Sequence, residues 1–174
     1  SDSSEVESAV ELALKHKGPV YIRLERAPSS DLDHPLKAFE YGKSEVIVPG
    51  SQVTIMAIGS MVEQAIIAAE QLKEQGISVR VINMRSLKPI DVDLIKSAAL
   101  ETELMVTVED HNSIGGLFSA VSEVVAGIKS NALVKSIAIK DQFAESGSSV
   151  DLRKKYGLTA DAIIEEITAY FEEK

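Results

Sequence analysis

The chain has 174 residues, carries a formal net charge of −9 at pH 7 and contains no cysteine. This length fits one ordinary domain with a short appendage. The acidic balance argues against nucleic acid or an anionic membrane as a partner, and the lack of cysteine excludes disulfides, thiolate nucleophiles and Cys-ligated zinc.

The first 26 residues contain one predicted helix and one predicted strand. Ser4 and Glu7 have the spacing of a capping box, and apolar residues then recur at helical intervals until Gly18-Pro19 ends the helix. Residues 20–25, Val-Tyr-Ile-Arg-Leu-Glu, alternate between apolar and polar, which predicts a strand with one buried face.

This first helix and strand lack the neighbours that a domain requires. Residues 27–35 contain two prolines among Ser and Asp, so they read as a linker. About 25 residues are too few to form a core of their own. We therefore interpret residues 1–26 as the end of a domain whose remainder lies upstream.

From Ser44 onward, strands and helices are predicted to alternate. Strands are expected at residues 45–48, 53–58, 78–83, 104–108 and 134–139. Helices are expected to begin near Ser60, Asp91, Leu117 and Thr159, and residues 146–149 are expected to form a turn. Such alternation predicts an α/β fold, a three-layer α/β/α sandwich with a mainly parallel sheet.

Three loops follow predicted strands, where open α/β sheets place their ligands. Gly59-Ser60 could present amides to an anion, although an ordinary turn explains it better. Residues 109–116 contain Glu109 and His111, a possible acid–base or metal site, but also residues suited to starting a helix. Residues 141–147 could line a cleft or form a turn. We find no Ser–His–Asp spacing, zinc signature or P-loop.

Three segments in series resemble the transketolase family. Residues 18–26, GPVYIRLER, resemble the closing strand of its pyrimidine-binding domain. Residues 108–117, VEDHNSIGGL, resemble the V-E-[ED]-H-x-x-x-GG-[LA] segment of its C-terminal domain. Residues 143–147, FAESG, with residues 155–159, KYGLT, resemble the closing F-x-x-SG and YGLT motifs. The resemblance covers essentially the whole chain.

The resemblance implies a division of the chain into two parts. Residues 1–30 would be the C-terminal end of the pyrimidine-binding domain. Residues 36–174 would be the C-terminal domain, with a five-stranded mixed sheet whose antiparallel strand is residues 45–48. Arg26 matches the arginine that binds the phosphate of the sugar substrate, a role suited to a permanently charged, bidentate guanidinium. A surface ion pair with Glu25 or Asp31 is the alternative.

The resemblance also implies what the intact enzyme needs and this chain lacks. Thiamine diphosphate and magnesium would serve the transfer of a two-carbon ketol unit between sugar phosphates, but nothing here matches the family's G-D-G motif or its catalytic glutamate. We expect no catalytic, cofactor-binding or metal-binding residue in this chain, no activity from it alone, a homodimeric enzyme completed by an N-terminal part, and a cytoplasmic location. A 1-deoxy-D-xylulose-5-phosphate synthase fragment and a non-catalytic docking module are the alternatives, and a nucleotide-binding oxidoreductase is disfavoured because no G-x-G-x-x-G turn follows a strand.

Overall fold

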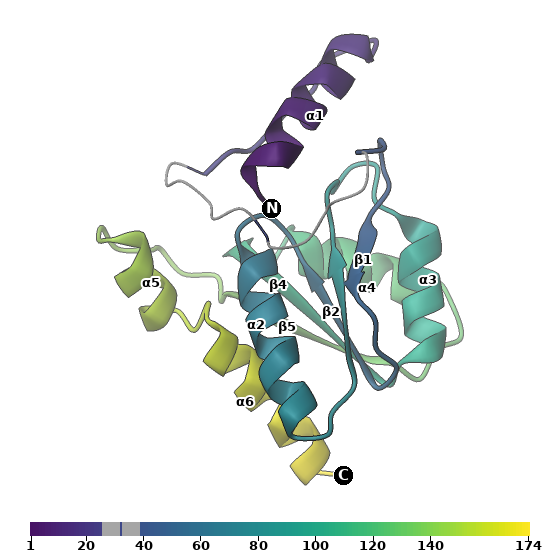
Figure 1. Ribbon diagram of the computed structural model, residues 1–174, viewed down its shortest axis with the longest axis vertical. Coiled ribbons are helices and arrows are strands. Elements are labelled where there is room, and N and C mark those ends of the chain that lie inside the picture. The colour runs from purple at the N-terminus through teal and green to yellow at the C-terminus, as the bar shows by residue number, and fades with distance from the viewer. Residues whose placement is uncertain (26–31, 33–38) are drawn as a thin grey trace.

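The fold is a five-stranded sheet covered by helices on both faces (Figure 1). The computed structural model describes residues 1–25, residue 32 and residues 39–174. The strands are β1 (Glu45–Val48), β2 (Val53–Ala57), β3 (Val79–Asn83), β4 (Leu104–Asn112) and β5 (Leu133–Ile139). The predicted three-layer α/β/α architecture is confirmed.

The sheet is mixed, and its strand order is β1-β3-β2-β4-β5. Strands β2 to β5 run parallel, whereas β1 lies antiparallel to β3 at one edge, as the family resemblance implied. Every residue of β2 is buried because helices cover both faces of this central strand. A continuous apolar run is what such a position requires.

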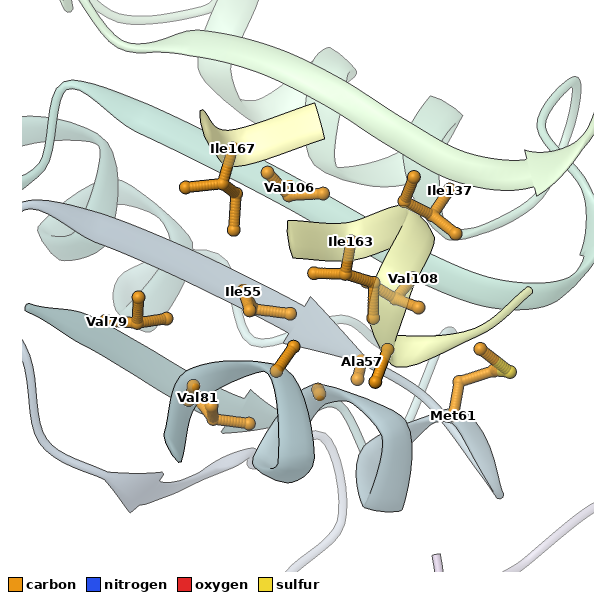
Figure 2. Close-up of a cluster of buried hydrophobic side chains, with 14 of the residues drawn as sticks. Ile55, Ala57, Met61, Val79, Val81, Val106, Val108, Ile137, Ile163 and Ile167 are labelled. Carbon is orange, nitrogen blue, oxygen red and sulfur yellow. The ribbon is translucent and has the colours of Figure 1, made fainter. Parts of the chain in front are cut away.

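Two apolar cores lie on the two faces of the sheet. Helices α2 (Met61–Glu74) and α6 (Ala160–Glu172) contribute to one core, in which Ile163 and Ile167 lie against the strands (Figure 2). Helices α3 (Val92–Glu101) and α4 (Leu117–Ala126) contribute to the other. The helix starts at Asp91 and Thr159 are confirmed, since each side chain accepts a backbone N–H in the first turn.

The predicted N-terminal helix is confirmed as α1 (Ser3–Lys15), which stands apart from the three layers (Figure 1). Its N-cap is Asp2 and not Ser4, because the Asp2 carboxylate accepts the Glu5 N–H at 3.2 Å. At its start, the Glu5 carboxylate accepts a hydrogen bond from Asn83 at 2.9 Å and pairs with Arg85 at 2.6 Å. This helix therefore meets the sheet through polar groups at one end.

The strand predicted at residues 20–25 does not form in this chain. The segment is extended, but among the described residues no neighbouring strand pairs with it. Alternating polarity specifies a face to bury, whereas a strand also needs backbone partners. Val20 is 38% exposed and Leu24 is 59% exposed, so the apolar side of the pattern remains unburied here.

A seven-residue helix, α5 (Ser149–Lys155), follows the last strand where only a turn was predicted. Ser148 caps it by accepting the Asp151 N–H. No helix in the part of the chain that the structure describes is both long and apolar enough to cross a membrane.

Candidate functional site

The carboxyl ends of the parallel strands bring the three predicted loops to one edge of the sheet. Ala57 of β2 pairs with Val108 of β4, and Asn112 at the end of β4 pairs with Ile139 of β5. The turn at Ser60 and the residues from Glu109 onward therefore begin side by side. This edge is where open α/β sheets bind ligands.

Glu109 is a buried cap for helix α4. Its side chain accepts the backbone N–H of Leu117 at 2.6 Å and that of Phe118 at 2.8 Å, and the residue is 1% exposed. The first amides of a helix lack partners within the helix, and a carboxylate there also meets the positive end of the helix dipole. Glu109 thus supplies the cap that Gly116 at the N-cap position, having no side chain, does not supply.

The paired glycines of the loop follow from this cap. A Cβ on Gly116 would lie 2.0 Å from Oε2 of Glu109 and 2.6 Å from the carbonyl oxygen of Asn112. Gly115 has a φ of +79°, a backbone conformation that favours glycine. The E-x-x-x-x-x-GG spacing is therefore explained by how closely the carboxylate approaches the helix start.

The structure separates the two residues of the predicted loop site. Burial raises the pKa of the Glu109 carboxyl, while the amides of Phe118 and Leu117 and the charges of His111 and Arg23 act against that rise. The side chain of His111 is exposed, and its Nδ1 lies 3.1 Å from the carbonyl oxygen of Asn112. Within the described residues, no hydrogen bond joins the side chains of Glu109 and His111.

A second set of polar groups at this edge, the Arg153 cluster, consists of Glu25, Ser60, Asp110 and Arg153. Nη2 of Arg153 donates to both carboxylate oxygens of Glu25, at 3.0 and 3.2 Å, and to Oγ of Ser60 at 2.7 Å. Ser60 donates in turn to Glu25, and its side chain makes no capping hydrogen bond to α2. Nε of Arg153 lies 4.0 Å from the Asp110 carboxylate.

Arg23 also connects the N-terminal segment to the domain. Its Nη2 donates to the backbone oxygen of Asp110 at 2.9 Å, so the segment before residue 26 is held at both of its charged side chains. Arg26 itself, the predicted phosphate-binding residue, lies outside the described residues. Sequence reasoning did not identify Arg153 as a site residue because it did not predict helix α5. Ser148 and Asp151 have the spacing of a helix-capping motif, and this motif could have predicted the helix.

The described residues do not fit thiamine diphosphate or magnesium, the groups implied by the resemblance. No three His, Asp or Glu side chains in residues 1–25, 32 and 39–174 are placed to hold a metal ion. The Arg153 guanidinium is paired with the Glu25 carboxylate, and the hollow beside it, bordered by Leu152 and Tyr156, holds about 120 Å³. We therefore derive no chemical step through the cofactor.

A larger hollow of about 340 Å³ lies at the β1 edge of the sheet. Lys43, Ser44 and Arg85 are among its lining residues. Lys43 faces Asp91 and Asp93, and Arg85 pairs with Glu5 and Glu45. The cations of this hollow are thus already neutralised by carboxylates.

Comparison with known proteins gives concordant matches. The family described as transketolase, C-terminal domain, matches residues 42–163. The 6-deoxy-6-sulfo-D-fructose transketolase subunit SqwH of Clostridium sp. (strain MSTE9) is 39% identical over 94% of this chain and 50% of its own length. The 1-deoxy-D-xylulose-5-phosphate synthase of Dictyoglomus thermophilum is 38% identical over 99% of this chain, which spans only 28% of that enzyme.

A solved structure matches as well. The chain of a split gene transketolase, described as an inactive beta4 tetramer, is 38% identical with a TM-score of 0.90 over 97% of this chain and 55% of its own length. The present chain thus spans about half of the length of these two transketolase relatives.

Proposed function

The chain belongs to the transketolase family, in which it corresponds to the C-terminal domain, and on that premise we propose that it is the C-terminal portion of an enzyme that transfers a two-carbon ketol unit between sugar phosphates. The likeness to the split gene transketolase chain carries this proposal, because it extends over 97% of the present chain. The similarity to that chain therefore extends beyond residues 42–163, which match the family model of the C-terminal domain.

We place the boundary between two domains in residues 31–35. Residues 1–30 would complete a pyrimidine-binding domain, and residues 36–174 would form the C-terminal domain. The exposure of apolar side chains upstream supports this division, since Leu14 is 81% exposed and Leu24 is 59% exposed. Apolar faces of this kind are expected where a neighbouring layer is absent.

Arg26 is proposed to bind the phosphate of the sugar substrate. A guanidinium is permanently charged, and its donors match two phosphate oxygens. The preceding residue, Glu25, has its carboxylate engaged by Arg153, which supports a role for Arg26 other than pairing with Glu25. For Glu109 the geometry favours helix capping over chemistry, and a role for exposed His111 stays a prediction.

Thiamine diphosphate with magnesium would supply the covalent carbanion chemistry of the intact enzyme. The present chain would supply structural contacts and the contacts of a cytoplasmic homodimer, together with the N-terminal part of the enzyme, and would be inactive alone. The tetramer of the split gene relative supports an assembled state.

A 1-deoxy-D-xylulose-5-phosphate synthase is the second candidate. The 38% identity to the Dictyoglomus thermophilum enzyme, over 99% of this chain, supports it. The strand end argues for the transketolase, because this chain has Glu25-Arg26-Ala27 where the synthases favour Pro-Arg-Gly. A docking module without catalysis is the third outcome.

A ketol-transfer assay separates the three candidates. This chain and its complete enzyme, in one or two polypeptides, would each receive xylulose 5-phosphate, ribose 5-phosphate, thiamine diphosphate and magnesium. We expect transfer by the complete form and none by this chain. Condensation of pyruvate with glyceraldehyde 3-phosphate in place of ketol transfer would favour the synthase, and inactivity in both assays would favour the docking module.

Replacing Arg26 tests its role in the complete enzyme. Arg26→Ala should raise KM for the sugar phosphate by at least about tenfold, since even one of the two charge-assisted hydrogen bonds contributes about 1.5 kcal/mol. Lys17→Ala removes an exposed cation from the same N-terminal part of the chain and serves as the matched control. An unchanged KM for Arg26→Ala would contradict the phosphate role.

A further inference from the structure

The Arg153 cluster joins parts of the chain that are far apart in sequence. Glu25 lies in the N-terminal segment, Ser60 in the turn between β2 and α2, Asp110 in β4 and Arg153 in α5. Residues 25 and 153 are 128 positions apart. A contact of this range fixes how the segment lies on the domain.

The cluster is a network and not a single surface pair. The Arg153 side chain is 22% exposed and that of Glu25 is 33% exposed, so both are partly withdrawn from water. One guanidinium nitrogen serves the Glu25 carboxylate and the Ser60 hydroxyl together, while Arg23 engages Asp110. Isolated surface pairs contribute little to stability, but networks with defined geometry order the groups that they join.

The charges in this region balance, which indicates positioning and not ligand capture. Two guanidinium groups, Arg23 and Arg153, lie among two carboxylates, Glu25 and Asp110. Arg153 is paired with the Glu25 carboxylate, and Arg23 donates to the backbone oxygen of Asp110, so each cation already has a partner within the protein. Balanced networks of this kind hold elements in register.

The contacts also fix the rotation of the segment. In an extended chain, successive side chains point to opposite sides, so Arg23 and Glu25 face one side and Leu24 faces the other. Arg23 and Glu25 both contact the domain, and Leu24 is 59% exposed. The apolar side thus stays turned away from the C-terminal domain.

We propose that Arg153 is a positioning residue that holds the end of the segment 20–25 on the carboxyl edge of the sheet, through Glu25 and Ser60. It thereby couples the C-terminal domain to the chain that leads directly into Arg26. Only the coupling to substrate rests on the proposed function; the anchoring of the segment is independent of it.

Spin-label distance measurements test the anchoring in this chain, which has no cysteine of its own to interfere. Labels at Tyr21→Cys and Glu70→Cys, both exposed positions, report the segment against α2. In the labelled protein that is otherwise wild type we expect one narrow distance distribution. Arg153→Ala and Glu25→Ala should each broaden it, and the variant with both substitutions should be no broader than either single variant. Lys154→Ala, an exposed neighbour on α5, should leave the peak unchanged.

An unchanged peak in Arg153→Ala would overturn the proposal, as would equal broadening in Lys154→Ala. Circular dichroism of each variant separates loss of anchoring from loss of folding. Partial recovery of the peak in Arg153→Lys is expected, since lysine keeps the charge but not the paired donors.

Kinetics of the complete enzyme test the coupling to substrate. Arg153→Ala should raise KM for a sugar phosphate by about tenfold and leave kcat and the KM for an unphosphorylated sugar nearly unchanged, because a lost positioning contact weakens phosphate binding alone. A fall in kcat with both sugars would contradict a positioning role. Should the wild-type enzyme lack ketol transfer, the proposed function fails, and the distance measurement still decides whether Arg153 anchors the segment.

Discussion

Residues 1–25 and the sheet domain carry the same kinds of sequence pattern but reach different structural outcomes. In the domain, amphipathic helices such as α6 bury their apolar residues, Ile163 and Ile167 among them. In α1, by contrast, Glu5 is the buried residue, while Val10 and Leu14 are exposed. An apolar stripe shows which face of a helix requires a partner, and the rest of the chain decides whether a partner is present.

The two regions are also held by different forces. The domain has two apolar cores on the two faces of its sheet. Residues 1–25 contact the domain through charged and polar groups, with Glu5 at Asn83 and Arg85 and with Arg23 and Glu25 at the opposite end of the segment. We therefore expect the domain to be stable without residues 1–25.

The largest effect on stability is expected when a leucine is replaced by alanine in the domain, compared with the same replacement in α1. Leu104→Ala removes a fully buried side chain of β4 and should lower the free energy of unfolding by about 3 kcal/mol, because it leaves a cavity. Leu14→Ala removes an 81% exposed side chain of α1 and should change it by less than about 0.5 kcal/mol. Urea unfolding measures both, and similar losses would contradict the distinction between the regions.

The next effect concerns the start of α4. Gly116→Ala should lower the free energy of unfolding by about 2 kcal/mol, because the new methyl group would overlap Oε2 of Glu109 and force the cap apart. Gly127→Ala is the control, since its nearest contact, at 3.4 Å, is an ordinary one. If both variants unfold at the wild-type urea concentration, Glu109 does not cap α4 as described.

A smaller effect, confined to α1, is expected from Glu5→Gln. Loss of the charge weakens the contact with Arg85 by about 1 kcal/mol, because Arg85 keeps its pairing with Glu45. The amides of α1 should then exchange hydrogen roughly fivefold faster, while those of β2 stay unchanged. Glu7→Gln, at an exposed position on the same helix, is the control; faster exchange in β2 would show that the two regions unfold together.

The smallest effect is a pH dependence at Glu109. Its pKa is raised in the folded protein above the ordinary 4.5, so the folded state holds the proton more tightly than the unfolded state. The stabilising contribution is therefore present below about pH 4.5 and is lost as the pH rises through the folded-state pKa.

Glu109→Gln removes this titration. The stability of the wild type relative to the variant should fall with rising pH over that window, measured by urea unfolding at several pH values. A relative stability that rises with pH would contradict the direction of the pKa shift.

The fold of the domain could be predicted from sequence because most of its helices and strands carry a local signal. The buried run of β2 and the cap at Thr159 both specify their structure within a few residues. Helix α5 could not be recognised by periodicity, because its seven residues include only Val150 and Leu152 as apolar side chains. The prediction of a strand at residues 20–25 was wrong for this chain. A strand needs a neighbouring strand to pair with, and the local sequence pattern does not show whether one is present.

The site was less predictable because its contacts join distant residues. The α/β rule correctly brought the loops at Ser60 and Glu109 to one edge of the sheet. The partners of Glu109, however, are backbone amides of Leu117 and Phe118, and the partner of Glu25 is Arg153. Such pairings depend on how the layers pack, and the spacing of charges along the chain does not reveal them.

Hydrogen exchange across the chain tests the central claim most directly, that residues 1–25 are the incomplete end of another domain. In this chain alone, amides of β2 should exchange near the rate of global unfolding, and those of α1 should exchange far faster. In the complete enzyme, residues 3–25 should gain protection close to that of β2. Protection of α1 equal to that of β2 in this chain alone would contradict the claim and make residues 1–25 an integral part of the C-terminal domain.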